Sequence, residues 1–246
     1  RAGEWIRTLR VLIGLLELGA AIKFVANADL VLGWGLFTRP AVLASWAVLA
    51  LICAIYLVRI SIRKSDRSGM RPASFLPAAA ASIVAAWLAM GIAGRPLRAI
   101  DAFLPPASNG RGVSRTTAQG ESWILNDYDG ALGAARANGK LVFIDFTGYT
   151  CTNCRWMEAN IFSRPDVGAE LGKFVLSRLY TDGDGALYER QQAFQEQTFG
   201  TVALPLYAIV DGKGNVRATF SGLTRNAAEF IDFLRKGDAP RVASVR

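Results

Sequence analysis

The sequence contains no histidine. That absence excludes serine–histidine–aspartate and cysteine–histidine catalysis, histidine-ligated metals, and haem attachment through a C-x-x-C-H motif. Cysteine is scarce too, because three cysteines in 246 residues are too few for a disulfide scaffold. With 52% hydrophobic and 20% charged residues, the composition also excludes wholesale disorder. The length allows one large domain or two of ordinary size.

Acidic residues are few in the first part of the chain. Residues 1–100 carry 12 Lys and Arg against 4 Asp and Glu, whereas residues 101–246 carry 16 of each kind. The whole formal charge of +8 therefore belongs to the apolar first part. That pattern is typical of the flanks of membrane helices rather than of a nucleic-acid-binding surface. We therefore expect a lipid bilayer, and no nucleic acid, among the partners.

Three apolar stretches predict a transmembrane domain over residues 1–95. Residues 41–58 and 73–94 carry no charge, whereas residues 9–28 are interrupted by Glu17 and Lys23. Each stretch is close to the ~20 residues that a membrane helix needs. In the middle of a span, Glu17 is either a polar group near a redox or proton route, or a carboxyl kept protonated or hydrogen-bonded.

The positive charges predict the orientation of these helices. The loop between the second and third spans is the most basic segment, so the positive-inside rule places it in the cytoplasm and everything after residue 94 outside. Its basic residues are Arg59, Arg63, Lys64, Arg67 and Arg71. Because the chain begins with Arg and shows no signal-peptide pattern, we expect it to be a fragment or a processed chain with earlier helices upstream.

After an irregular, proline-containing linker at residues 96–122, the pattern predicts an α/β domain over residues 123–240 in the order αβααβαββα. The expected strands cover residues 141–146, 174–180, 206–211 and 216–221, the last two forming a hairpin. The expected helices cover residues 127–138, 151–162, 187–199 and 226–236, with a short one opening at Pro165. Thr150 is a candidate N-cap for the second of these helices.

The motif that carries chemistry is Cys151-Thr152-Asn153-Cys154, between a strand and a helix N-terminus. One helical turn brings the two sulfurs close enough for a small disulfide ring. The helix dipole and unpaired N–H groups stabilise a thiolate at Cys151, and Cys154 lies one turn deeper, where it can attack a mixed disulfide. A structural zinc site needs four ligands, and the sequence has no histidine and only Cys53 besides, so redox chemistry is favoured and no metal or cofactor is expected.

The sequence resembles the DsbD-type thiol:disulfide interchange proteins. Residues 142–158, VFIDFTGYTCTNCRWME, resemble their C-terminal domain, and residues 14–35, GLLELGAAIKFVANADLVLGWG, resemble their late membrane helices. Asp145 and the Leu204-Pro205 pair are placed as in thioredoxins. The resemblance implies a thioredoxin-like domain after the membrane helices, and an electron relay from a membrane cysteine pair to periplasmic disulfides. The chain departs from the family pattern, because it shows only three membrane helices and no membrane cysteine pair. Thr150 replaces the usual tryptophan, and Tyr149 is a candidate for the aromatic lip.

The resemblance also implies roles for three further residues. Asp145 lies among apolar neighbours, which should raise its pKa, so it either relays a proton to and from Cys154 or is a carboxylate at a strand end. Glu158 shares a helix face with both cysteines and is either a second acid or a partner of Arg155. Pro205 is expected to be cis, exposing backbone for a substrate strand.

The sequence therefore predicts a protein-disulfide reductase anchored in the bacterial inner membrane, with its thioredoxin-like domain in the periplasm. The expected partners are periplasmic proteins that contain disulfides and an upstream membrane domain that donates electrons. Two alternatives use the same dithiol: a tethered thioredoxin-like protein for cytochrome c maturation, and a non-enzymatic copper(I) carrier. The absence of His and of Met near the motif counts against the carrier.

Overall fold

The computed structural model describes residues 2–68, 72–105, 115–116 and 122–238. The chain divides into two compact units, one of residues 1–30 and 34–100 and the other of residues 31–33 and 101–246. Arg71 and much of the expected linker, Pro106 included, lie outside the described residues. Within that linker the structure places a 3₁₀ helix, η2 (Arg98–Phe103), and a two-residue strand, β1 (Arg115–Thr116).

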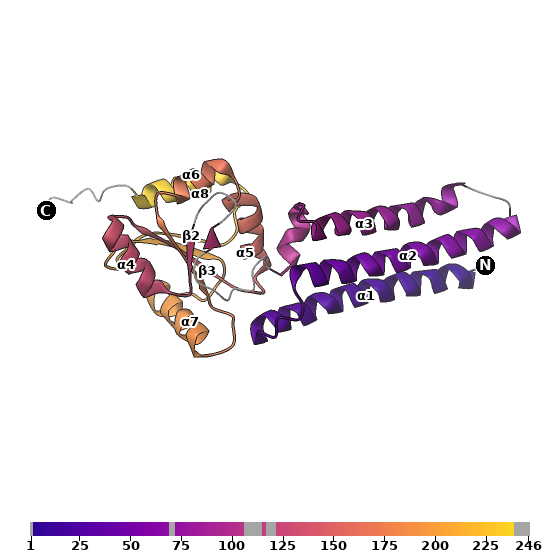
Figure 1. Cartoon of the computed structure of the whole chain (residues 1–246), viewed down its shortest axis with the longest axis horizontal. Coiled ribbons are helices and arrows are strands. Elements are labelled where there is room, and N and C mark those ends of the chain that lie inside the picture. Colours follow the sequence, from indigo (N-terminus) through magenta and orange to yellow (C-terminus); the bar gives the residue numbers. More distant parts are fainter. Residues whose placement is uncertain (1, 69–71, 106–114, 117–121, 239–246) are drawn as a thin grey trace. The chain divides into compact units, whose positions relative to one another are not determined.

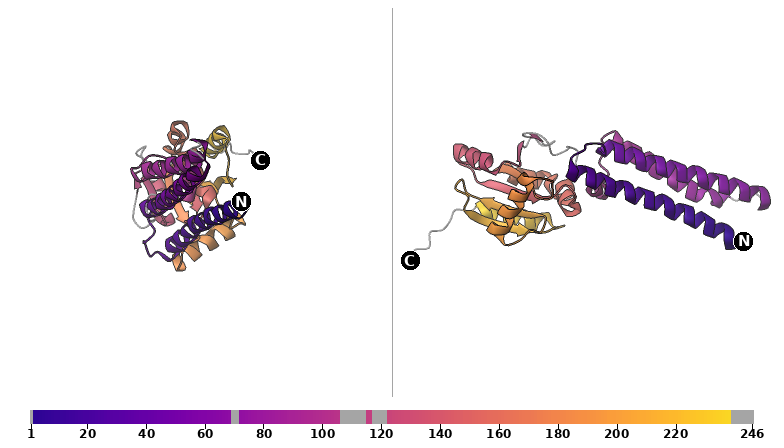
Figure 2. Two further views of the ribbon diagram at one scale, coloured as in Figure 1. Left: turned by 90° about the vertical axis from the view of Figure 1, so that its right-hand side faces the viewer. Right: turned by 90° about the horizontal axis from the view of Figure 1, so that it is seen from below.

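The first unit is helical. Its elements are α1 (Ala2–Leu32), α2 (Arg39–Ser68), the 3₁₀ helix η1 (Pro72–Phe75) and α3 (Leu76–Ile92). Helices α2 and α3 lie side by side (Figure 2). The indole N–H of Trp46 on α2 donates to the carbonyl oxygen of Gly19 on α1 at 3.0 Å. Proline near the start of α3 is well placed, because an N-terminal turn has no use for its missing N–H.

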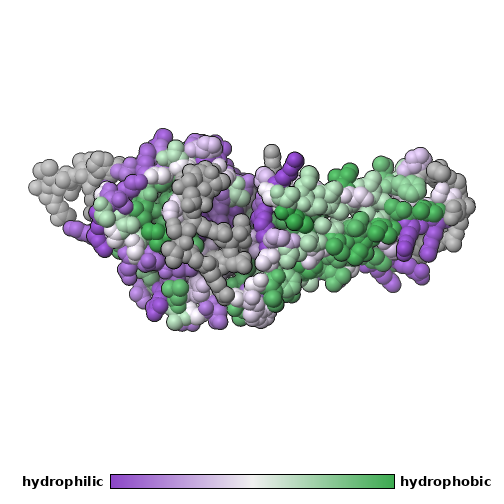
Figure 3. All heavy atoms as spheres, in the orientation of Figure 1, coloured by the Kyte–Doolittle hydropathy of each residue, from purple (hydrophilic) through white to green (hydrophobic). Residues whose placement is uncertain are grey.

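Two helical segments of this unit, Arg39–Arg63 and Pro72–Ile92, are long and apolar enough to cross a membrane. They correspond to the second and third expected spans. Only 17% of the apolar window of each segment is buried, whereas a core helix of a soluble protein would be mostly buried. Hydrophobic side chains gather on the surface of these helices (Figure 3). Helix α1 is not among the segments that qualify, so its crossing of the membrane stays a prediction.

The second unit contains a six-stranded sheet with helices on both faces (Figure 1). The strand order is β1-β2-β4-β3-β5-β6. The strands after β1 are β2 (Ser122–Leu125), β3 (Val142–Thr147), β4 (Val175–Tyr180), β5 (Leu206–Val210) and β6 (Val216–Ser221). Strand β3 lies in the middle, parallel to β4 and antiparallel to β5, and all six of its residues are buried. An apolar run covered on both faces is what the sequence of this strand predicts.

The helices of this unit are α4 (Tyr128–Asn138), α5 (Thr152–Met157) with a π-helical turn (Glu158–Phe162), α6 (Pro165–Leu171), α7 (Ala186–Phe199) and α8 (Ala227–Asp238). Helices α5, α6 and α8 cover one face of the sheet around Phe143, and α4 and α7 cover the other around Phe146. Asp127 caps α4 by accepting from the Gly130 N–H at 2.8 Å, and Gly139, at φ 63°, ends it.

The expected α/β domain is confirmed, and its elements begin and end within two residues of their predicted limits. Strands β1 and β2 were not expected, because residues 115–125 contain no long alternating or apolar run. Trp123 of β2 is nevertheless buried and packs against Phe143 and Phe162. β2 therefore completes the core on the α5 side of the sheet.

Candidate active site

Cys151 and Cys154 form a disulfide where β3 leads into α5, with their Cα atoms 5.3 Å apart. Cys151 is the N-cap of α5, and its Sγ accepts the backbone N–H of Cys154 at 3.1 Å. The expected N-cap, Thr150, is therefore wrong, because the sulfur occupies the place that a capping oxygen takes in other helices. Cys151 is half-buried and Cys154 is 1% exposed. A partner can therefore reach the outer sulfur, while the inner one lies behind it.

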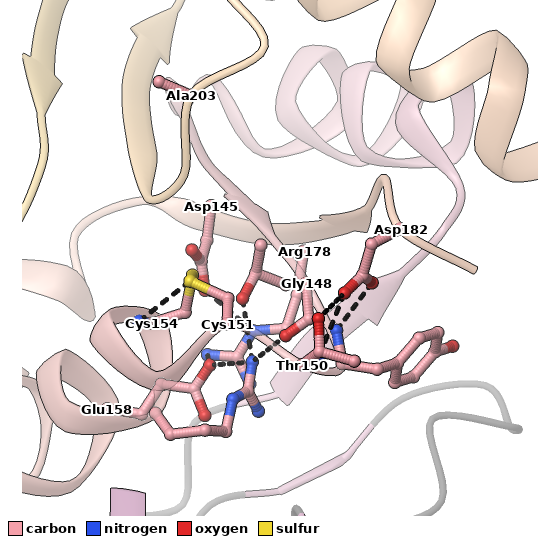
Figure 4. The surroundings of a disulfide bond; sticks show 12 residues. Asp145, Gly148, Thr150, Cys151, Cys154, Glu158, Arg178, Asp182 and Ala203 are labelled. Carbon is pink, nitrogen blue, oxygen red and sulfur yellow. Dashed lines mark hydrogen bonds and ion pairs between the residues drawn. A yellow bond between two sulfur atoms is a disulfide. The ribbon is translucent and has the colours of Figure 1, made fainter. Parts of the chain in front are cut away.

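The loop before Cys151 is held by Asp182, which follows β4. Its carboxylate accepts the backbone N–H of Tyr149 at 2.6 Å, the N–H of Thr150 at 2.9 Å and the Thr150 hydroxyl at 2.8 Å (Figure 4). Gly148 lies against the same carboxylate, and a Cβ there would come within 2.6 Å of Asp182 Oδ2. These contacts fix the backbone that presents Cys151.

Tyr149 does not form an exposed aromatic lip. It is 5% exposed, and its ring stacks on Tyr180 with the centroids 4.0 Å apart. Its hydroxyl lies 3.1 Å from that of Tyr188, and burial together with this contact raises the pKa of Tyr149. The rings of Tyr149, Tyr180 and Tyr188 therefore pack together and support the loop. Because Tyr149 is the only aromatic residue among residues 148–150 and is buried, the exposed place of the usual tryptophan is not filled from this segment.

Asp145 lies on β3, six residues before Cys151, and is 1% exposed. Its side chain points toward the disulfide (Figure 4). Burial raises the pKa of Asp145 to about 6, although Arg178, whose Nε lies 2.8 Å from Asp145 Oδ2, lowers it in part. The direction is the one expected from its apolar neighbours. A carboxyl that titrates near neutral pH is suited to exchange a proton with a nearby thiol.

Glu158 lies one turn beyond Cys154 and begins the π-helical turn. Its Oε1 is 2.8 Å from Arg155 Nη2 and 3.4 Å from Arg178 Nη2. Glu158 therefore pairs with Arg155, which was one of the two interpretations made from the sequence, and its role as a second acid stays a prediction. Arg155 is 5% exposed and donates to the Thr147 hydroxyl at 2.8 Å, so it connects α5 to the end of β3.

Pro205 precedes β5 and has the cis peptide bond with Leu204 that was expected. Leu206 pairs with Phe146 in the sheet, so Pro205 lies at the end of β3 from which the Cys151 loop departs. Its carbonyl oxygen accepts the N–H of Gly222 at 2.8 Å, which ties it to the end of β6. The fold thus brings all five predicted residues, Cys151, Cys154, Asp145, Glu158 and Pro205, to one end of the sheet.

Within the described ranges, no group of three or more His, Cys, Asp or Glu side chains could hold a metal ion. The third cysteine, Cys53, lies on α2 in the helical unit. The candidate site contains a cysteine pair with two neighbouring carboxyl groups.

Comparison with known proteins finds relatives of this chain. Residues 123–212 match a family model described as thioredoxin-like. The chain is 28% identical over 193 residues to thiol:disulfide interchange protein DsbD 2 of Pseudomonas aeruginosa, and 26% identical over 191 residues to DsbD of Ralstonia nicotianae. The curated relatives of this chain are DsbD thiol:disulfide interchange proteins. This finding confirms the resemblance seen in the sequence.

The match to DsbD extends beyond the thioredoxin-like domain. The alignment with DsbD 2 covers 76% of this chain. Residues 101–246 make up less than two thirds of the chain, so the alignment must also include part of residues 1–100. The chain spans 30% of the length of these DsbD relatives. A solved structure of the Neisseria meningitidis DsbD C-terminal domain, in the oxidised form, aligns with 44% of this chain and 90% of that chain at 20% identity and a TM-score of 0.36.

Two charged residues beside the dithiol, Arg178 and Asp182, were not predicted from the sequence, and Arg155 was expected only as a partner of Glu158. Arg178, Asp182 and Arg155 are all charged residues of ordinary appearance in the sequence. Arg178 interrupts an otherwise apolar or small-residue strand, which is a signal that its side chain needs a buried partner. Asp182 carries no comparable signal, because its partners are donors of residues 149 and 150 that only the fold brings near. The contacts of Arg155 with Thr147 and Gly148 are likewise decided by the fold.

Proposed function

We propose that this chain is a thiol:disulfide oxidoreductase that works as a protein-disulfide reductase through Cys151 and Cys154. The observation that carries the proposal is the pairing of a half-exposed sulfur at a helix N-terminus with a buried sulfur one turn behind it, beside a buried acid. Thiolate character, access and a resolving cysteine are the three requirements of thiol–disulfide exchange. The DsbD relatives support the same activity.

The reaction proceeds in two exchanges. The Cys151 thiolate attacks one sulfur of a substrate disulfide, forms a mixed disulfide and releases the first substrate sulfur as a thiolate, which takes a proton from water. Cys154 then gives its proton to an acceptor and attacks the Cys151 sulfur. The second substrate sulfur leaves, and the Cys151–Cys154 disulfide remains. Two electrons have passed from the dithiol to the substrate.

The oxidised dithiol needs a reductant, and we assign that role to an upstream membrane domain with a cysteine pair. The helical unit of this chain contributes one cysteine, Cys53, so it cannot form such a pair by itself. Proteins with disulfides outside the cytoplasm are the proposed substrates. These assignments follow from the DsbD relatives, of which this chain spans 30%.

The helical unit is proposed to anchor the chain in the bacterial inner membrane. Segments Arg39–Arg63 and Pro72–Ile92 are apolar and little buried, which supports contact with lipid. The basic residues after the second span favour a cytoplasmic loop there and a periplasmic thioredoxin-like domain. This orientation depends only on the basic segment between the second and third spans, so it does not require α1 to cross the membrane. In the proposed arrangement α1 supplies the remaining span.

A trapping experiment tests the proposed activity. In a Cys154→Ala variant, the mixed disulfide between Cys151 and a disulfide-bonded model protein should persist and be seen as a shift on a non-reducing gel. The matched Cys151→Ala variant should form no such adduct, because Cys154 is 1% exposed. Adducts in Cys151→Ala but not in Cys154→Ala would reverse the assignment, and adducts in neither would remove the proposed activity.

A further inference from the structure

Arg178 connects the two carboxyl groups beside the dithiol. It lies directly opposite Asp145 in the β3–β4 register. Its Nε is 2.8 Å from Asp145 Oδ2, and its Nη2 is 3.4 Å from Glu158 Oε1. Two nitrogens of one guanidinium thus form ion pairs with two different acids, Asp145 on β3 and Glu158 at the end of α5. The planar fork of an arginine can do this, whereas the single ammonium of a lysine cannot do it in the same geometry.

Other groups hold this arrangement in place. The Arg178 guanidinium lies over the Trp123 ring, 4.2 Å from its centroid, and Trp123 is 3% exposed. Arg155 contacts Glu158 from the other side at 2.8 Å and is anchored to Thr147 at 2.8 Å. The side chains of Asp145, Arg155, Arg178 and Glu158 are 1%, 5%, 15% and 20% exposed. Asp145 and Arg155 have little access to water as an alternative partner, and Arg178 and Glu158 have limited access.

These four residues, here called the charge cluster, contain two carboxylates and two guanidiniums. Three further titratable groups lie beside it. Tyr180 of β4 interacts with the two arginines, Tyr207 of β5 lies opposite Asp145, and Cys154 of α5 lies beside Asp145 and Glu158 in Figure 4. Burial and the nearby carboxylates raise the pKa of Tyr207, so it stays neutral. The charge cluster is therefore balanced when both acids are ionised, and it is the place where a proton from Cys154 can be accommodated.

We propose that Arg178 is a positioning residue which, by bridging Asp145 and Glu158, keeps this acid pair ionised at neutral pH as the proton acceptor for Cys154. The inference rests on the proposed dithiol chemistry. In the resolving step, the Cys154 proton moves to a carboxylate of the pair while the Cys154 thiolate attacks Cys151 and expels the bound thiolate. The proton transfer by itself leaves the net charge of the cluster and the dithiol unchanged. The expelled substrate thiolate then carries one negative charge away and takes a proton from water, and the protonated acid of the pair later releases its proton to solvent.

Removal of the guanidinium should disable this acceptor at neutral pH. Without Arg178, the buried Asp145 and the partly buried Glu158 share only Arg155, so the pair should hold a proton at neutral pH. The acid pair then cannot take the Cys154 proton until the pH is higher. Arg178→Met and Arg178→Gln both remove the charge, one keeping the apolar stem and the other a polar end. Arg178→Lys keeps the charge without the two-pronged bridge.

The experiment uses the full chain in detergent with Cys53→Ser, so that the dithiol supplies the only thiols. The reduced chain is mixed with dithionitrobenzoate, whose two halves are released as coloured thiolates, first by Cys151 and then by Cys154. No protein substrate is needed, so the result does not depend on whether the trapping experiment succeeds. Infrared difference spectra of the same samples at about pH 8 report any protonated carboxyl group directly. Arg235→Met is the matched control, because Arg235 pairs with Glu170 instead.

We expect both neutral variants to keep the first phase and to slow the second about tenfold or more at pH 7, since a shift of one pH unit in the acceptor's titration corresponds to tenfold. The second phase should recover at higher pH, Arg178→Lys should be intermediate, and Arg235→Met should match the parent. The neutral variants should also show a protonated-carboxyl band that Asp145→Asn or Glu158→Gln removes. A missing band, or a band with an unchanged second phase, would overturn the inference.

Discussion

Asp182 Oδ2 accepts two hydrogen bonds from the same residue, one from the backbone N–H of Thr150 at 2.9 Å and one from its hydroxyl at 2.8 Å. Thr150 is the residue immediately before the outer cysteine. Asp182, on the loop that follows β4, thereby fixes the backbone that follows the neighbouring strand β3. The same carboxylate also accepts from Tyr149, so one side chain satisfies three donors. A residue without predicted chemistry thus determines where Cys151 is presented.

We predict that Asp182→Ala lowers both stability and Cys151 reactivity. Three donors to one carboxylate lose their acceptor, which should cost about 3 kcal/mol in the free energy of unfolding, since such donors are half-buried. The freed loop should slow alkylation of reduced Cys151 several-fold. Thermal melting in detergent and iodoacetamide kinetics measure the two effects. Asp184→Ala, an exposed neighbour, is the control, and an equal loss in that variant would contradict the role of Asp182.

Asp145→Asn should separate the two steps of disulfide exchange. The first attack should survive, because the helix N-terminus still acts on Cys151. Release by Cys154 should be retarded, because the amide cannot accept the Cys154 proton. Stopped-flow reduction of dithionitrobenzoate resolves the two phases. If both phases are unchanged from about pH 6 to about pH 9, Asp145 is a structural carboxyl and not a proton relay.

The same residue should make stability depend on pH. The pKa of Asp145 is raised from 3.8 to about 6 in the folded chain, so the folded state binds more protons than the unfolded state between these values. The stabilisation due to the protonated form is therefore fully present below about pH 4 and is lost as the pH rises through about 6, a change of about 3 kcal/mol. Thermal melting against pH measures this fall.

The control for that measurement is the difference between variants. Asp145→Asn cannot titrate, so its melting temperature should lack the fall between pH 4 and 6 that the parent shows. Asp166→Asn, which removes an exposed carboxylate paired with Arg164, should retain the fall. Parallel curves for the parent and Asp145→Asn would show that burial of Asp145 does not control this pH dependence.

The proposed topology predicts which side of the membrane exposes Cys151. In a Cys53→Ser chain within intact spheroplasts, a membrane-impermeant maleimide should label reduced Cys151 from outside. A cysteine introduced by Ser65→Cys, on the basic segment after the second span, should be labelled only after lysis. The opposite pattern would place the thioredoxin-like domain in the cytoplasm and would contradict the periplasmic assignment.

Several features of the fold follow from local sequence. The short apolar run at residues 141–146 predicts a strand covered on both faces, because its side chains can only be accommodated between two layers, and the structure has β3 at Val142–Thr147. Capping by Asp127 and termination at Gly139 set the limits of α4. The spacing of Cys151 and Cys154 after that strand predicts a dithiol at a helix start, which the structure shows. Short-range periodicity and turn chemistry suffice for such features.

Strand β2 is a feature that the sequence could not specify. Its four residues are too few for a periodic signal, and Trp123 becomes a core residue only through contact with Phe143 and Phe162. The membrane segments illustrate the reverse case. Apolar length predicts α2 and α3 as spans, but in α1 the same length includes Glu17 and Lys23, and what faces these charges depends on neighbours beyond the helix itself.

The sequence by itself determined the dithiol, the acid six residues before it and the thioredoxin-like order of strands and helices, because each depends on spacing within one or two elements. Only the tertiary structure decided that Arg178 bridges Asp145 and Glu158 and that Asp182 holds Thr150. Those pairs are 20 to 33 residues apart in sequence. Sheet register and helix packing bring them within hydrogen-bonding distance, and a buried charge becomes stable only once such a partner is in place.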